Sequence, residues 1–253
     1  MPRVSLRRIL ALGLLLGACP VLAQQLVIGS GSQLSLGDAT LQAGCADLRV
    51  DGIVNIAAGS LLGAGDVRVD GVLDGGSGTL ALSGDLAAPG LVPQSGTVRI
   101  ASGCASAGST LTGGHLFNRL SVENTTAYAL VLPSGTTQTI NTGLVLQGGV
   151  ERLVMRSTTP GAVSLLLLLS GGSQSIARVD AIDVGAPEPG QYLAEVDPAS
   201  IDSIDRGNTP RFLGVMGSDT PVPLPTLNGF WLGVLVLLVG VPAVRRLRSR
   251  AVT

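Results

Sequence analysis

A segment of ten residues in the first third of the chain recurs after an interval of 19 residues. The segment DLRVDGIVNI begins at Asp47 and DVRVDGVLDG begins at Asp66, and five of their ten positions are identical. Short apolar strands followed by Gly and Asp, returning about every 20 residues, are typical of a solenoid in which each repeat forms one coil. One coil cannot bury its apolar side alone, whereas stacked coils bury it against each other.

The alternation inside the repeat indicates which side chains are buried. Leu48, Val50, Val67 and Val69 are expected to point inward, and the arginines between them outward. Gly accounts for 36 of 253 residues and aromatic residues for 2%, which fits short strands separated by frequent turns. We therefore predict an all-β body over residues 24–215, folded as a right-handed parallel β-helix. A β-sandwich is the main alternative, because short strands with Gly turns also build sandwiches.

The N-terminal segment has the layout of a secretory signal peptide. Residues 1–23 contain three arginines, then an apolar stretch, then small residues. A signal peptidase would cleave between Ala23 and Gln24. Lipidation of Cys19 is the alternative, since residues 16–19 resemble a bacterial lipobox. Both interpretations predict that the chain is exported.

The C-terminal segment has the layout of a membrane anchor. Residues 227–244 are uncharged, and this length is near the lower limit of roughly 17–25 residues for a spanning helix. A Pro-rich linker over residues 216–226 precedes it and a basic tail over residues 245–253 follows it. By the positive-inside rule the tail is cytoplasmic and the body lies outside. The arginines that set this topology are Arg245, Arg246, Arg248 and Arg250.

A short motif, Leu224-Pro225-Thr226-Leu227, stands directly at the start of this apolar stretch. The order of motif, short apolar helix and Arg-rich end resembles the IPTL-CTERM sorting signals. These are relatives of the PEP-CTERM signals that exosortase-type enzymes handle in Gram-negative bacteria. The resemblance implies a bacterial envelope protein whose partners are the membrane and an exosortase-type enzyme. It also implies that the body is either anchored or released to the surface after processing. A plain single-span protein of the inner membrane, facing the periplasm, is the alternative.

The second half of the body carries another resemblance. Residues 116–149, with the step LFNRL and the segment GTTQTINTGLVLQGG, resemble coils of bacterial surface and adhesin-like repeat proteins. The segment IDSIDRGNTPRF, which begins at Ile201, resembles the last coils of such domains. This resemblance implies a solenoid and a cell-surface setting.

The charges and the cysteines of the body narrow its chemistry. With both ends set aside, nine arginines and no lysine face all 17 acidic residues, which argues against nucleic acid as a partner. Cys45 and Cys104 form an even pair in an exported chain, which favours a disulfide. About three coils separate them, and coils stack roughly 4.8 Å apart, so this bond requires a loop that folds back. Two free thiols are the alternative.

Few residues are candidates for catalysis. His115 is the single histidine, and no Cys/His cluster has the spacing of a zinc site. Asp180 with Asp183, and Asp202 with Asp205, are the carboxylate pairs that a polysaccharide-cutting enzyme could use. Residues three apart on a strand point to opposite faces, however, which favours solvated turn carboxylates. We therefore predict no catalytic residue, no metal site and no cofactor.

Together these features predict an exported, envelope-anchored surface protein without catalytic activity. Its expected role is structural or adhesive, in extracellular matrix, with extracellular polysaccharide or other surface proteins as partners. The alternative function is that of a polysaccharide-acting β-helix enzyme, a lyase or a hydrolase.

Overall fold

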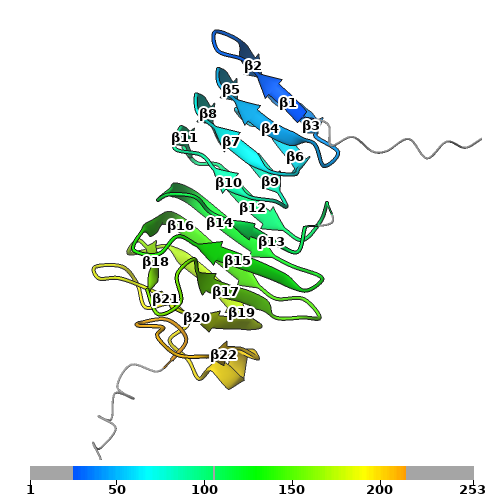
Figure 1. Ribbon diagram of the computed structural model, residues 1–253. Helices are drawn as coiled ribbons and strands as arrows, with labels where there is room; N and C mark the ends of the chain where they lie inside the picture. Colours follow the sequence, from blue (N-terminus) through cyan, green and yellow to red (C-terminus); the bar gives the residue numbers. More distant parts are fainter. Residues whose placement is uncertain (1–24, 105, 215–253) are drawn as a thin grey trace, which may run out of the picture.

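A computed structural model describes residues 25–104 and 106–214 of the chain (Figure 1). In this part the backbone winds through about eight turns of a parallel β-solenoid, with one 3-10 helix, η1 (Pro198–Ile201), near its end. Each ladder between the named strands is parallel. The predicted parallel solenoid is confirmed, and a β-sandwich is excluded because its sheets are antiparallel.

The first four coils are three-sided. Face A contains β1 (Gln25–Ile28), β4 (Asp47–Val50), β7 (Val67–Val69) and β10 (Leu86–Ala87). Face B contains β2 (Gln33–Ser35), β5 (Ile53–Asn55), β8 (Val72–Asp74) and β11 (Leu91–Val92). Face C begins with β3 (Thr40–Gln42), β6 (Ser60–Ala64), β9 (Thr79–Leu82) and β12 (Thr97–Ala101).

The later coils use longer strands. Face C continues through β14 (Leu116–Glu123), β16 (Thr137–Gln147), β18 (Ser164–Leu168), β19 (Ser173–Ala177) and β21 (Val184–Gly185). A fourth sheet, face D, contains β13 (Gly108–Thr110), β15 (Tyr128–Leu132), β17 (Leu153–Ser157), β20 (Val179–Ile182) and β22 (Ile204–Asp205). A parallel bridge between Leu86 and Leu111 makes face D the continuation of face A.

The coil length changes along the stack, which corrects the expectation of a constant repeat. Val67 pairs with Leu86, 19 residues later, whereas Leu153 pairs with Val179, 26 residues later. The larger coils enclose the largest buried side chains, among them Phe117 and Tyr128. A wider cross-section accommodates these rings, since interiors are packed without voids.

Alternation along each strand forms the core, as the sequence predicts. Leu48, Val50 and Val69 are fully buried, while Arg49 and Arg68 on the same strands are exposed. Each arginine forms an ion pair with the aspartate two residues later, at 3.0 Å and 2.7 Å. These pairs place the strand's polar side in water and its apolar side in one continuous core.

The recurring aspartates form a ladder at one corner of the early coils. The Asp66 N–H donates to Asp47 Oδ1 at 3.0 Å, and the Asp85 N–H donates to Asp66 Oδ1 at 2.8 Å. Asp85 Oδ1 in turn accepts the Thr110 N–H at 2.7 Å. Gly84 precedes Asp85 because a Cβ there would lie 2.0 Å from Asp66 Oδ1. Each aspartate thus satisfies a backbone donor of the next coil where the strand begins.

Candidate functional site

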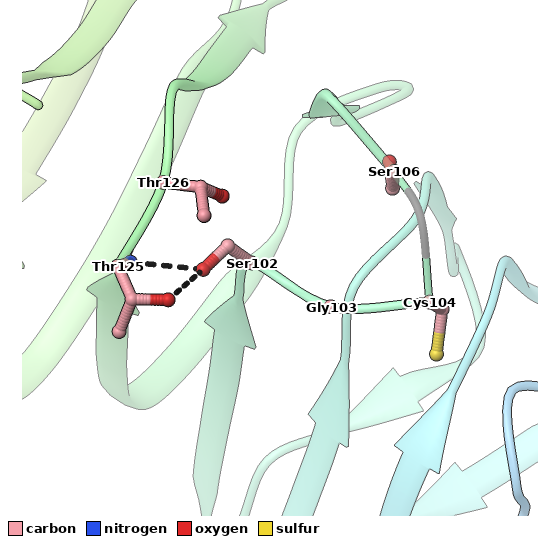
Figure 2. Close-up of a pocket in the computed structure, with 6 residues that line it drawn as sticks. All are labelled: Ser102, Gly103, Cys104, Ser106, Thr125 and Thr126. Carbon is pink, nitrogen blue, oxygen red and sulfur yellow. Dashed lines mark hydrogen bonds between the residues drawn. The ribbon is translucent and has the colours of Figure 1, made fainter.

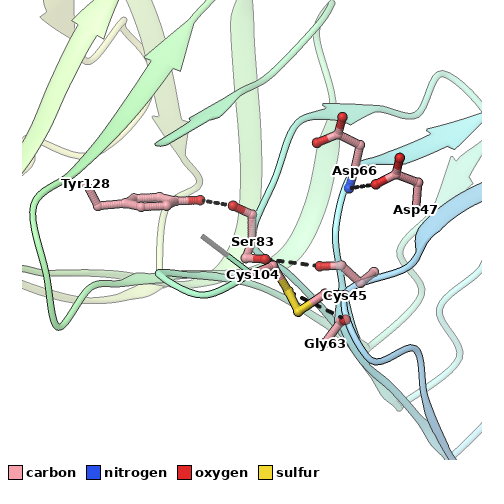
Figure 3. The surroundings of a disulfide bond; sticks show 8 residues. Cys45, Asp47, Gly63, Asp66, Ser83, Cys104 and Tyr128 are labelled. Atoms are coloured by element: carbon pink, nitrogen blue, oxygen red, sulfur yellow. Dashed lines mark hydrogen bonds between the residues drawn. A yellow bond between two sulfur atoms is a disulfide. The ribbon is translucent and has the colours of Figure 1, made fainter. Parts of the chain in front are cut away.

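A disulfide joins Cys45 to Cys104, whose Cα atoms lie 5.3 Å apart (Figure 3). The Cys45 N–H donates to the Gly63 carbonyl of the next coil, so simple stacking would leave Cys104 two coils further away. Cys104 instead lies in a loop after β12 that folds back, with a left-handed φ of 47° and its Sγ 4.0 Å from the Gly63 oxygen. The reversal of this loop brings the two sulfur atoms within bonding distance.

Two hydrogen bonds support the coils beneath this loop (Figure 3). The Ser83 hydroxyl donates to the Ala64 carbonyl at 3.2 Å, and the Tyr128 hydroxyl donates to the Ser83 carbonyl at 2.7 Å. Burial raises the pKa of Tyr128 to about 12, so its hydroxyl stays a neutral donor near pH 7. Tyr128 therefore ties face D to the early coils from inside the core.

A shallow depression of about 270 Å³ lies beside the disulfide (Figure 2). It is lined by Ser102, Gly103, Cys104, Ser106, Thr125 and Thr126. The Ser102 Oγ accepts the Thr125 N–H at 2.9 Å and lies 3.1 Å from Thr125 Oγ1. The lining offers hydroxyl and backbone groups but no carboxylate, imidazole or amine, so it supplies no general acid or base.

His115 is buried between coils and both of its ring nitrogens have partners. Nδ1 lies 3.0 Å from Gln138 Oε1, and Nε2 accepts the Ala88 N–H at 3.2 Å. Burial lowers the pKa of His115, because the charged imidazolium loses its hydration. The ring also stacks on Phe117, with centroids 5.7 Å apart. This histidine holds coils together and contacts no nucleophile.

The first pair of candidate carboxylates is engaged by the chain itself. Arg206 donates from Nε and Nη2 to the two oxygens of Asp180, each at 2.5 Å. Asp183 accepts from the Gly161 N–H at 2.8 Å and from Asn208 Nδ2 at 2.6 Å. The hydrogen bond from Asn208 lowers the pKa of Asp183 by favouring its ionised form.

The second pair is engaged in the same way. Asp202 forms ion pairs with Arg152 and, at 2.7 Å, with Arg178. Asp205 Oδ1 accepts from the Gly207 N–H and from the Thr209 hydroxyl, both at 2.7 Å. These carboxylates fasten the last coils, as turn carboxylates do. The arginine partners come from other coils, 24 to 50 residues away, so linear spacing gave no signal for them.

Several predicted residues lie outside the described part of the chain. They are Cys19, Ala23, Gln24, the motif Leu224, Pro225, Thr226 and Leu227, and the tail residues Arg245, Arg246, Arg248 and Arg250. Within residues 25–104 and 106–214, no helix has the length and hydropathy to cross a membrane. The same residues contain no group of three His, Cys, Asp or Glu side chains arranged to hold a metal ion.

Comparisons with protein-family models, curated proteins and solved structures give no match to this chain. What the chain does is therefore inferred from its own residues.

Proposed function

We propose that this chain is an exported, envelope-anchored surface protein without catalytic activity, with a right-handed β-solenoid as its body. Its role is structural or adhesive, in extracellular matrix, and its partners are extracellular polysaccharide or other surface proteins. An exosortase-type enzyme reads its C-terminal motif, Leu224 to Leu227. The body faces away from the cytoplasm, held by the helix over residues 227–244 or released after processing.

One observation carries the non-catalytic part of this proposal. The histidine and the four aspartates that the sequence offers for catalysis all hold neighbouring coils through hydrogen bonds or ion pairs. A catalytic group needs an open partner that can exchange a proton with substrate, within about 3 Å. Side chains committed to the fold suit a scaffold, whose task is to stay rigid under load.

The aromatic residues support the same choice over a polysaccharide-acting enzyme. Phe117, Tyr128 and Phe212 are buried, at 2% exposure or less, so their rings support the core. Ring faces inside the core cannot stack on sugars. A glycosidase also places two carboxyl groups about 5–10 Å apart around the scissile bond. The depression beside the disulfide has none in its lining.

The proposed address rests on the two ends of the chain. Residues 1–23 have the order of a signal peptide, and four arginines follow the apolar residues 227–244. These ends independently indicate that the body leaves the cytoplasm. The disulfide between Cys45 and Cys104 fits this setting, since disulfides persist in oxidising compartments.

Two experiments test the proposal. The first is mass spectrometry of both termini of the full chain, recovered from the inner membrane, outer envelope and medium of a bacterial host with an exosortase-type enzyme. We expect Gln24 as the first residue, and a surface form that lacks Arg245 to Arg250. An intact Arg250 in each fraction would refute the sorting. The second is an activity screen on acidic and neutral polysaccharides, where sustained cleavage by the purified chain would refute the scaffold role.

A further inference from the structure

The N-terminal end of the solenoid is open. Strands β1, β2 and β3 are each the last strand of their sheet, and Figure 1 shows them together at one end of the stack. The inward side chains of this coil are only half-buried, among them Leu26, Leu34 and Leu41. Their register partners one coil further in are fully buried. One added layer of chain therefore suffices to complete the burial.

The first coil has the composition of an interior coil. Residues 25–46 carry a single charge, Asp38, which lies in an exposed turn. Free edge strands of soluble proteins are usually protected by charged side chains, prolines or bulges. The segments QLVI, QLS and TLQ that form β1, β2 and β3 contain no charge and no proline, and their ladders to the second coil show no bulge. This edge lacks the features that keep edges apart, which indicates that it is covered.

The opposite end of the described solenoid is closed. Leu193 and Phe212 bridge in parallel beyond face C, and both are buried together with Leu213. The turn η1 and the ion pairs of Asp202 lie at the same end. A head-to-tail stack of copies would have to open this cap. The first coil is therefore matched in chemistry by the first coil of another copy, apolar interior against apolar interior.

We propose that two copies of this chain dock through their first coils, around a two-fold axis that sets β1, β2 and β3 of one copy against the same coil of its partner. Two-fold symmetry makes such an interface self-complementary and closed. The pairing supplies backbone partners for three free edges and buries Leu26, Leu34 and Leu41 of both copies. The proposal rests on the signal cleavage proposed above, which leaves Gln24 as the single residue before β1.

Native mass spectrometry of the full chain in a mild detergent tests this proposal, because one spectrum gives both the subunit's first residue and the number of copies. We expect a dimer of subunits that begin at Gln24. Leu34→Lys places two charges in the shared core, and Val27→Lys puts an exposed lysine on the free edge strand. Like charges enclosed together cost several kcal/mol, so we expect the dimer dissociation constant to rise at least about tenfold.

Val72→Lys is the matched control. Val27 and Val72 are both exposed valines on strands, but Val72 lies in the third coil, where its strand has neighbours on both sides. The control should leave the dimer unchanged, and circular dichroism should show the same strand signal in each variant. Val27→Lys keeps the test decisive if Leu34→Lys fails to fold.

The remaining outcomes also decide the question. A monomer that begins at Gln24 overturns the docking and leaves the export proposal standing. A monomer that retains residues before Gln24 overturns both. A dimer that retains those residues and is broken by Val27→Lys supports the docking and overturns the cleavage. A dimer that resists both variants is held elsewhere, such as in residues 215–253, and overturns the docking.

Discussion

Removing the disulfide tests how the solenoid distributes its stability. Cys45→Ser with Cys104→Ser deletes a link that closes a loop of 59 residues. In the chain-entropy model such a loop restricts the unfolded chain by about 14 cal/mol/K, or about 4 kcal/mol at 25 °C. We therefore expect the free energy of unfolding in urea to fall by about that amount. Reduced wild-type chain should match the double variant, and each single variant should match it too.

The loss should be uneven along the stack. In a solenoid each coil contacts only its neighbours, so stability is approximately a sum of local terms. The link connects the second coil to the loop after β12, and it therefore restrains the early coils most. Hydrogen exchange should accelerate more in residues 47–101 than in residues 128–185. A loss below about 1 kcal/mol, or equal acceleration in both regions, would refute this reasoning.

Three further substitutions probe the core and a corner. Burial lowers the pKa of His115, so the unfolded chain binds its proton more tightly and stability declines as pH falls below about 6.5; His115→Gln should flatten this decline between pH 7.5 and 5.5 in urea titrations, and an unchanged slope would contradict the assignment. Tyr128→Phe should remove a tyrosinate absorbance step at about pH 12 and cost about 1–3 kcal/mol, since a buried carbonyl loses its donor; a persisting step at that pH would contradict it. Gly90→Ala should cost about 1–3 kcal/mol because its Cβ would lie 1.8 Å from the Gly71 oxygen, whereas Gly29→Ala at the open end meets nothing within 4 Å and should be neutral; equal melting temperatures would show that the corner relaxes.

The fold was predictable because repetition and alternation are properties of the linear sequence. The 19-residue interval and the positions of Leu48 and Val50 are sufficient to predict stacked coils and their inward side. The growth of the coils was not predictable in this way. It depends on how Phe117 and Tyr128 pack together in the core, which the local pattern around either residue does not encode.

The candidate site was less predictable than the fold, for a related reason. The reversal of the chain at Cys104 brings it back across two coils, and a repeat argument describes only steps between neighbouring coils. Asp180 and Asp202 are recognisable as acidic residues in the sequence. Their partners, Arg206 for one and Arg152 for the other, become neighbours only after the coils stack. Long-range ion pairs of this kind leave no mark in local spacing.

The state of the thiols in living cells tests the central claim, that the body is exported, most directly. Rapid acid quenching followed by a maleimide of added mass would label each free cysteine. We expect the mature chain to gain no label, because cleavage after Ala23 removes Cys19 and the disulfide protects Cys45 and Cys104. Leu14→Arg in the leader should block export and expose the thiols. A wild-type chain that carries labels on Cys45 and Cys104 would place the body in the cytoplasm and contradict the account.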